Sequence, residues 1–290
     1  MLTCIFHLNA LSALHVGIGQ AVGVVDLPIA RAKATNLPIV PGSAIKGVLR
    51  DEFISNDANQ KTLFGPESIN GDETAHASAL AFGDAHLLLL PVRSMAGVVA
   101  FVTCPFVLAR YTADLQRAAI AAIPPMPKEN LSGAQVCTET KLKASGNTVI
   151  LEDLDLNAED GADGWADFIA KQLYPDEAKD KNWVRLFKER FAIISDDDFS
   201  FLADTATEIR ARIRINDKTG VVQPGALWYE ENLPAESVLW GVIAAGAARD
   251  NSKLTQDQVM SAFVTAIGTG KTIQIGGKAT VGRGLVRFIL

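Results

Sequence analysis

Cysteine is scarce in this sequence of 290 residues, which contains only Cys4, Cys104 and Cys137. No two of them form a Cys-x-x-Cys pair and their number is odd, so neither a disulfide framework nor a thiolate zinc site is predicted. The four histidines show no His-x-His or His-x-x-x-His spacing, which argues against a preformed metal cage of imidazoles. A reducing cytoplasm is the natural setting for such a chain.

Long uninterrupted hydrophobic runs are also missing. The most apolar stretch, residues 87–109, is broken by Pro91, Arg93 and Pro105, and it falls short of the ~20 apolar residues that a membrane-spanning helix needs. The first ten residues lack a basic leader before their apolar positions, so a secretory signal is not indicated. We therefore expect a cytoplasmic protein with no membrane partner.

Charged residues are few, at 21% against 48% hydrophobic residues, and the formal net charge is −6. This composition supports a packed core, and it argues against a protein that coats nucleic acid through overall positive charge. The charges are segregated, because residues 31–50 and 271–290 hold eight of the 27 basic residues and none of the 33 acidic ones. That pattern fits a confined anion-binding surface and chance basic runs equally well.

The hydrophobic patterns predict strands that interleave with helices, so the expected fold class is α+β. The expected strands are 2–8, two strands within 80–107 that are separated at 91–93, 208–215, 226–229, 272–275 and 285–290. The expected helices are one that starts at Ser43 and others over 112–122, 162–173, 182–191 and 256–267. Ser43 is a suitable N-cap for the first helix, whose apolar face would include Ile45 and Phe53. Thr255 and Gln258 predict a capping box for the last helix.

Two glycine-rich motifs look like nucleotide-binding loops but lack the required context. Residues 268–272 read GTGKT, but a phosphate-binding loop needs a glycine where Thr265 stands, and a strand rather than a helix before it. Residues 17–23 have GxGxxxG spacing instead of GxGxxG, and an extended segment with prolines follows them. A nucleotide site is therefore not predicted at either place.

Two other segments are candidates for binding a polyanion. Residues 41–50, PGSAIKGVLR, lead from a turn into a helix whose free amides attract phosphates. The candidate contacts on this helix are Ser43, Lys46 and Arg50. Residues 276–284, GGKATVGRG, would let an anion approach the backbone, with Gly277, Lys278 and Arg283 as candidate contacts. The same two patterns are also explained without anion binding, by an ordinary capped helix and by a hairpin that carries basic side chains on its surface.

Acidic residues do not identify a catalytic site by their pattern alone. Asp26 precedes Leu-Pro, a position at which aspartate commonly forms a turn. Glu230 and Glu231 follow an aromatic pair at the end of an expected strand, where charge usually faces solvent. The three aspartates at 196–198 point in different directions, and such a run is usually a solvated cap or turn.

Four segments, taken in order, resemble one protein family. They are VVDLPIARAKATNLPIVPGSAIKGVLRDEF (24–53), LAFGDAHLLLLPVRSMAGVVAFVTCPFVLAR (80–110), GALWYEENLP (225–234) and IQIGGKATVGRGLVRF (273–288). The set resembles the RAMP superfamily of CRISPR proteins, specifically the repeated backbone subunit of type III-B (Cmr) effector complexes. The PGS-x-IKG-x-LR element and the glycine-rich end are typical of the superfamily, whereas VDLPI, FGDAHLLLLPVRS and LWYEE point to the backbone subunit.

The resemblance implies a ferredoxin-like palm, similar to an RNA-recognition motif, with helical insertions and a projecting thumb in a single domain over 1–290. The least recognisable part, about residues 110–198, would be a variable helical and loop insertion. Residues 205–230 are a candidate thumb hairpin. The alternation in EIRARIRI would put Arg210, Arg212 and Arg214 on one face of this hairpin.

The resemblance also implies an activity and partners. Copies of the subunit would form a helical filament along one CRISPR RNA with other Cmr subunits, and would cleave complementary single-stranded target RNA at regular intervals. Asp26 matches the family's cleavage residue, in a metal-dependent endoribonuclease with a divalent ion, Mg²⁺, as cofactor and Asp26 as its ligand. His15, and either Glu230 or Glu231, match neighbouring positions implicated in cleavage.

Two alternatives remain. The chain could be a RAMP subunit that binds guide RNA and assembles without cleaving, which the presence of Asp26 disfavours. It could instead be a small-molecule enzyme that uses its glycine loops for a phosphorylated ligand. RNA that co-purifies tightly with the protein would separate the RNA-binding interpretations from this last one.

Overall fold

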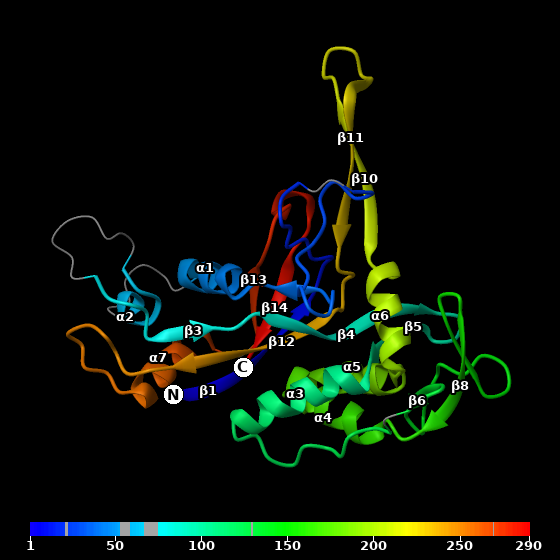
Figure 1. Cartoon of the computed structure of the whole chain (residues 1–290), viewed down its shortest axis with the longest axis horizontal. Coiled ribbons are helices and arrows are strands. Elements are labelled where there is room, and N and C mark those ends of the chain that lie inside the picture. Colours follow the sequence, from blue (N-terminus) through cyan, green and yellow to red (C-terminus); the bar gives the residue numbers. More distant parts are fainter. Residues whose placement is uncertain (21–22, 53–58, 67–74, 129, 269) are drawn as a thin grey trace.

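The computed structural model describes residues 1–20, 23–52, 59–66, 75–128, 130–268 and 270–290. Within these ranges, twelve strands form one continuous sheet and two more form a separate hairpin (Figure 1). No helix among the described residues is long and apolar enough to cross a membrane. Strands and helices interleave along the chain, which confirms the predicted α+β class.

One half of the sheet is antiparallel. Its main strands are β1 (Leu2–Ala10), β4 (Ala85–Ser94), β12 (Val238–Ala245), β13 (Lys271–Gln274) and β14 (Leu285–Ile289). They lie in the order β13-β14-β1-β12-β4, while the short strands β2 (Ile39–Val40) and β3 (Leu80–Phe82) pair with β4 and β12. Because β1 is hydrogen-bonded on both sides, it is buried along its length from Ile5 to Ala10.

The other half of the sheet closes on itself like a barrel. From β4 the path continues through β5 (Val98–Thr103), β9 (Phe191–Ile193), β6 (Ala134–Val136), β8 (Leu154–Asp160) and β7 (Thr148–Leu151). A pairing of Ser94 with Leu151 returns β7 to β4 and completes the ring. Closure leaves short edges, which protects the strands from pairing with other chains.

Helices cover the sheet. They are α1 (Gly42–Glu52), α2 (Gln60–Phe64), α3 (Pro105–Arg117), α4 (Asp163–Leu173), α5 (Glu177–Lys188), α6 (Asp196–Thr205) and α7 (Gln256–Ile267). Phe82 of β3 contacts Phe64 of α2 and Phe263 of α7, and Tyr111 of α3 packs edge-on against Trp240 of β12. One buried apolar cluster extends through both halves of the sheet, so the core is continuous.

The separate hairpin consists of β10 (Glu208–Ile215) and β11 (Val222–Asn232), and it projects from the body of the molecule (Figure 1). Arg212 lies opposite Trp228, and Ile213 lies opposite Leu227. The hairpin therefore has one face with arginines and a tryptophan, and one face that is apolar. The apolar face is open, because Ile213 is 50% and Leu227 56% exposed.

Several sequence predictions are confirmed. Residues 2–8 lie in β1, 162–173 correspond to α4, and 208–215 are β10. Thr255 accepts a hydrogen bond from the Gln258 amide and the Gln258 side chain accepts one from the Thr255 amide, which is the predicted capping box. The three aspartates at 196–198 form the first turn of α6, capped by Ser195.

The predicted strand break at residues 91–93 is wrong, since β4 runs through Pro91 without interruption. Pairing of β4 with β12 ends at Leu89, and its pairing with β5 begins at Leu90. A proline is tolerated where a strand is hydrogen-bonded on one side only, because its missing N–H then removes no hydrogen bond between the strands.

Two predicted helices are displaced. The helix expected over 112–122 is α3, which begins at Pro105 because proline is preset for the first helical turn. The helix expected over 182–191 is α5, which begins earlier because Asp176 caps it by accepting from the Lys179 amide. Phe191 instead lies buried in β9. The segment 110–198, predicted as helices and loops, also contributes four strands to the closed half of the sheet.

The predicted N-cap role of Ser43 is also wrong, because α1 already begins at Gly42 and Ser43 lies inside its first turn. The Gly42 amide donates to Asp84 Oδ1 at 2.8 Å, so that carboxylate occupies the helix end. A Cβ at residue 42 would lie 2.3 Å from the Phe82 carbonyl oxygen, so only glycine fits there. Ile45 is buried as expected, and Phe53 lies outside the described residues.

Candidate functional site

The four candidate cleavage residues come from distant parts of the chain and meet at the base of the hairpin. The loop that carries Asp26 lies alongside β11, where Leu27 pairs in parallel with Glu230. The Leu27 amide donates to the Tyr229 carbonyl (3.1 Å), and the Glu231 amide donates to the Leu27 carbonyl (3.0 Å). These main-chain bonds bring Asp26 next to the glutamates, as the resemblance implied.

Asp26 is held at the wall of a cavity. Its Oδ2 accepts a hydrogen bond from the Tyr229 amide at 2.8 Å, and the side chain is half-buried. The cavity has a volume of about 470 Å³. It is lined by Gln20, Asp26, Leu27, Arg214, Gly225, Leu227, Trp228 and Lys278. The cavity thus joins the Asp26 loop, the hairpin and the loop of residues 276–284, which we call the closing loop. We call this cavity the hairpin groove.

Glu230 is enclosed by three donors. Its carboxylate accepts from Lys278 Nζ at 2.8 Å, Trp228 Nε1 at 2.8 Å and Arg212 Nε at 3.0 Å. Burial alone would raise the pKa of Glu230, but the hydrogen bonds from Lys278, Trp228 and Arg212 outweigh it and lower that pKa to about 2. Glu230 therefore stays ionised and fixes the orientation of these three side chains.

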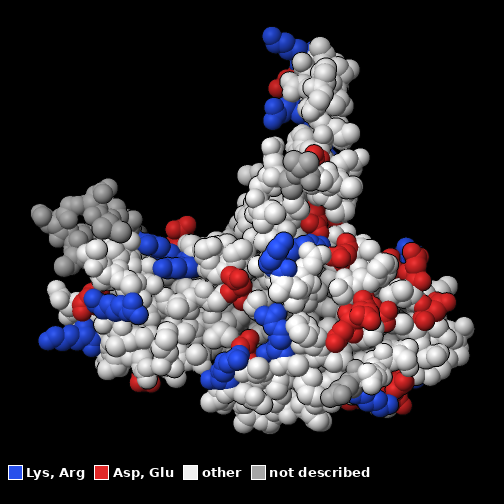
Figure 2. Space-filling view, viewed as in Figure 1, with Lys and Arg blue, Asp and Glu red and all other residues white. Residues whose placement is uncertain are grey.

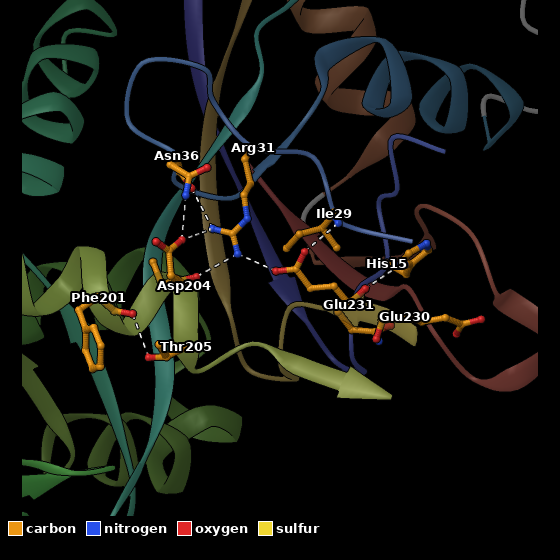
Figure 3. A network of polar contacts seen from close by, with 11 residues as sticks. His15, Ile29, Arg31, Asn36, Phe201, Asp204, Thr205, Glu230 and Glu231 are labelled. Atoms are coloured by element: carbon orange, nitrogen blue, oxygen red, sulfur yellow. Dashed lines mark hydrogen bonds and ion pairs between the residues drawn. The ribbon is translucent and has the colours of Figure 1, made fainter. Parts of the chain in front are cut away.

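Glu231 is buried and bound to Arg31. Arg31 Nη2 donates to Glu231 Oε1 at 2.6 Å, and the Ile29 amide donates to Oε2 at 3.1 Å (Figure 3). Both carboxylate oxygens are thus occupied within the protein. The bonds from Arg31 and Ile29 tie the base of β11 to the loop that follows Asp26.

His15 is oriented by the backbone of the same glutamate. Its Nδ1 lies 2.7 Å from the Glu231 carbonyl oxygen, and because a carbonyl only accepts, Nδ1 carries the proton. In that tautomer Nε2 is an acceptor. Glycines allow close packing here, since a Cβ at Gly17 would lie 2.7 Å from Nε2 and one at Gly276 would lie 2.4 Å from the His15 carbonyl oxygen. The Gly277 amide donates to that carbonyl at 2.9 Å.

The predicted RNA-binding residues occupy two different settings. On α1, Ser43 is exposed, Lys46 Nζ donates to Ser78 Oγ at 3.2 Å, and Arg50 is half-buried. In the closing loop, Lys278 is paired with Glu230, and Arg283 lies 3.9 Å from Glu208 with a side chain only 17% exposed. The closing-loop cations thus belong to the base of the hairpin and have acidic partners there, whereas Lys46 has a neutral one.

Sequence reasoning missed three residues of this region. Arg31 was counted only as part of a basic window, but it is the counter-ion of Glu231. Arg214 and Trp228 line the hairpin groove. The alternation in residues 208–215 already put Arg214 beside Arg212, but the pairing of Arg212 with Trp228 needs the strand register.

The residues present do not form a metal cage. Among the described residues, no group of three or more His, Cys, Asp or Glu side chains is arranged to hold a metal ion. Glu230 and Glu231 are neutralised by cations, so Asp26 is the carboxylate at this site that faces the groove without a basic partner in the described part of the chain. A single carboxylate fits a Mg²⁺ ion whose other ligands are water and substrate phosphates.

Charge on the surface is segregated as the sequence indicates. Acidic side chains gather over the part of the body that carries β6 and β8, at the right of Figure 2, where residues 151–163 contain six acidic and no basic residues. Basic side chains are most numerous at the left and in the middle of this face, and others lie at the end of the hairpin (Figure 2). A polyanion is therefore expected to avoid the β6–β8 side.

Comparisons with known proteins agree over almost the whole chain. The family model described as RAMP superfamily matches residues 7–287. The "CRISPR system Cmr endoribonuclease Cmr4" of Pyrococcus furiosus is 35% identical over 295 aligned residues, which cover 98% of this chain and 94% of that protein. The "CRISPR system CMR subunit Cmr4" of Saccharolobus solfataricus is 23% identical, also over 98% of this chain and 94% of that protein.

Solved structures show the same fold. Oligomeric Cmr4 from Pyrococcus furiosus superposes with a TM-score of 0.75 at 27% identity, covering 100% of this chain and 97% of that one. A chain of the type III-B Cmr-beta complex bound to cognate target RNA superposes with a TM-score of 0.72, covering 100% of this chain and 97% of that one. Its identity is 18%, so this likeness concerns the fold alone.

Proposed function

The chain belongs to the RAMP superfamily, and from this premise we propose that it is the backbone subunit of a type III-B CRISPR effector complex. In this role it binds CRISPR RNA in a filament with further copies of itself and other Cmr subunits, and it cleaves complementary target RNA. The name of the relative at 35% identity, an endoribonuclease, supports the activity. The oligomeric Cmr4 structure supports the assembly of copies.

We also propose that the antiparallel half of the sheet is a ferredoxin-like palm. Taken in chain order, β1, β4, β12 and β14 are the first to fourth strands, and they lie in the spatial order fourth-first-third-second. Helix α1 lies between the first and second strands, and α7 between the third and fourth. This succession has the β-α-β-β-α-β order of the ferredoxin-like motif, which supports the proposal. The β10–β11 hairpin is proposed as the thumb because it projects from this palm.

The observation that carries the cleavage proposal is the contrast between the three carboxylates. Glu230 and Glu231 each have a basic partner within 2.8 Å, whereas Asp26 is held by a main-chain amide and lines the hairpin groove. A carboxylate without a basic partner beside bound phosphates is unfavourable unless it takes part in the chemistry or shares a cation with them. Asp26 is therefore the acid that we assign to the reaction.

The side chains of the groove suit attack of a ribose 2′-hydroxyl on the adjacent phosphodiester. In the Nδ1-protonated tautomer, Nε2 of His15 lies beside Gly17 and is the group that we assign to accept the hydroxyl proton. Lys278 and Arg214 bring positive charge to the groove, which stabilises the charge that develops on the phosphate. The ring of Trp228, fixed through its Nε1 by Glu230, offers a surface on which an unpaired base can stack.

We propose that Mg²⁺ is the cofactor and that Asp26 holds it together with RNA phosphate oxygens. When bound, the ion supplies stabilisation of the phosphorane-like charge in the transition state. The lone carboxylate supports this sharing, because the described residues provide no group of three or more ligands for a resident metal. Cleavage is then expected to depend on added Mg²⁺ while guide binding persists in a chelator.

The test is an Asp26→Asn variant in a reconstituted complex with guide and complementary RNA. Asparagine keeps an oxygen that accepts from the Tyr229 amide, so the loop stays in place while the charge is lost. We expect cleavage to fall by at least about a hundredfold, the order seen when a positioned acid or base is removed. The Asp26→Asn complex should bind guide and target RNA as the wild type does.

The matched control is Asp153→Asn, an exposed aspartate in the turn between β7 and β8. It should cleave at the wild-type rate. Full-rate cutting by Asp26→Asn at the usual intervals would reject the assignment of Asp26. A wild-type complex that binds guide and target but never cleaves would favour a scaffold subunit instead.

A further inference from the structure

Arg31 joins three segments at the edge of the proposed cleavage site. Its Nη1 donates to the Asn36 carbonyl (2.8 Å) and to Asp204 Oδ1 (3.0 Å), and its Nη2 donates to the Ala203 carbonyl (3.1 Å) and Glu231 Oε1 (2.6 Å). In Figure 3 the guanidinium lies between α6 and the buried glutamate. Because the side chain is only 17% exposed, these four bonds fix one geometry.

The main chain of Glu231 is connected to both candidate reacting groups. Its carbonyl accepts from His15 Nδ1 at 2.7 Å. Its amide donates to Leu27, the residue after Asp26, at 3.0 Å. A shift of this one residue would therefore change the tautomer of His15 and the position of the Asp26 loop together.

We propose that Arg31 is a positioning residue for RNA cleavage, which acts by neutralising the buried Glu231 carboxylate. While Arg31 balances the charge of Glu231, the Glu231 backbone stays in place. Its carbonyl then keeps the proton of His15 on Nδ1, and Nε2 is free to accept a proton. The effect on cleavage rests on the proposed function. The effect on the histidine tautomer does not.

The physical basis is the cost of an unpaired buried charge. Without Arg31, the Glu231 carboxylate keeps one amide donor, from Ile29, in a site that is only 6% exposed. Such a carboxylate either takes up a proton or turns toward water, and in the second case it pulls the backbone with it. Lysine would restore the charge but not the four bonds, because it lacks the planar fork of arginine.

The first experiment reads the tautomer directly in the full chain without RNA. Only four histidines are present, so ring ¹⁵N shifts of ¹⁵N-histidine-labelled protein can be assigned with a His15→Asn variant. The wild type should show His15 protonated on Nδ1. In Arg31→Met the His15 signal should move toward the Nε2-protonated or exchanging form, and in Arg31→Lys it should stay close to the wild type.

The matched control is Arg190→Met. Arg190 is equally buried, at 20% exposure, and donates to the carbonyls of Gly97 and Leu186 and to Glu189, away from the site. Its loss should destabilise the chain to a similar degree and leave the His15 signal unchanged. A His15 signal that moves equally in Arg190→Met and Arg31→Met would mean a general loosening, and would reject the positioning role.

The second experiment measures cleavage in the reconstituted complex. Arg31→Met should lower the rate between about tenfold and a hundredfold, as expected for misplaced reacting groups, with guide binding unchanged. The double variant Arg31→Met with Glu231→Gln removes both charges and keeps an acceptor for the Ile29 amide. It should recover both the His15 tautomer and most of the lost rate.

The outcomes are separable. An unchanged His15 tautomer in Arg31→Met overturns this inference even if Asp26 proves essential. Failure of the double variant to recover the tautomer overturns it too, since charge balance would not be the cause. A wild-type complex without cleavage overturns the proposed function, and the tautomer result still stands or falls on its own.

Discussion

Glu230 and Asp26 are neighbours across one main-chain pairing, but their carboxylates have different surroundings. Glu230 is 1% exposed and bound by Lys278, Arg212 and Trp228, whereas Asp26 is half-buried and bound by the Tyr229 amide. Burial with matched cations turns the first carboxylate into an internal anchor. The second keeps the freedom to interact with a ligand in the groove.

The anchoring role of Glu230 should be visible in the free energy of unfolding at acid pH. Because the folded-state pKa of Glu230 is about 2, below its ordinary 4.5, its stabilising contribution is complete above about pH 4.5 and is lost as the pH falls toward 2. The contribution at neutral pH is at most about 3 kcal/mol. Glu230→Gln should therefore unfold more easily at pH 7 and should show a flatter dependence of unfolding free energy on pH between 4.5 and 2.

Denaturant unfolding at several pH values measures this. The exposed Glu139→Gln serves as control and should follow the wild-type curve. His7 contributes a separate loss of stability as the pH falls from 6.5 to about 4. Burial lowers its pKa from 6.5 to about 4, so the unfolded chain takes up a proton at His7 over this range and the folded chain does not. Parallel curves for Glu230→Gln and wild type from pH 4.5 to 2 would contradict the anchor role.

At the scale of elements, the β10–β11 hairpin separates two kinds of side chain by the alternation of a strand. Two arginines on its polar face have acidic partners, Arg210 with Glu208 and Arg212 with Glu230, and Arg214 lines the groove. The opposite face presents Ile213 and Leu227 to solvent, and Leu227 also lines the edge of the groove. Exposed apolar surface of this kind usually marks a binding face.

The hairpin's apolar face should matter for function and not for folding. Ile213 and Leu227 are about half exposed, so a double change of both to serine should alter the melting temperature little. If the hairpin is the thumb, the same variant should change the spacing of target cuts or weaken assembly. Gel mapping of the cleavage positions and sizing of the assembly are the measurements.

The control for this double variant is another exposed apolar side chain. Val98 is 81% exposed at the start of β5, and Val98→Ser should leave spacing and assembly unchanged. Normal cut positions and normal assembly in the Ile213 and Leu227 double variant would show that the apolar face of the hairpin is not a functional contact.

At the scale of the whole molecule, a net charge of −6 coexists with a site for RNA because the charges are distributed unevenly. The acidic residues of 151–163 lie in β8, in the turn before it and at the start of α4, on the side of the closed half of the sheet. Basic residues differ in how far they are neutralised. Lys46 contacts a serine, whereas Lys271 is paired with Glu52 at 3.2 Å.

These two lysines give a matched test of guide binding. If Lys46 neutralises one RNA phosphate, Lys46→Ala should reduce the slope of log affinity against log salt by about one unit, for all guide sequences alike. Lys271→Ala should leave the slope unchanged, because its charge is already balanced by Glu52. Equal slopes in wild type and Lys46→Ala would place the guide away from α1.

Some features followed from local sequence alone. The α+β class, strands β1 and β10, helix α4 and the capping box of α7 were predictable because alternation, helical spacing and caps act between residues close in the chain. Local patterns failed where tertiary contacts competed with them. Asp84 took the place of Ser43 at the end of α1, and β4 continued through Pro91 because of how its neighbours pair.

The candidate site was accessible to sequence only through resemblance. No pattern within the chain indicates that His15 and Asp26 meet the two glutamates, because the glutamates follow about 200 residues later and are joined to them by pairing between a loop and β11. Residue types and their local order determined the elements of this protein. The tertiary structure decided which carboxylates are neutralised, by Arg31 and Lys278, and which one remains open to the groove. The reason is that burial and ion pairing depend on distances that the linear order of residues does not contain.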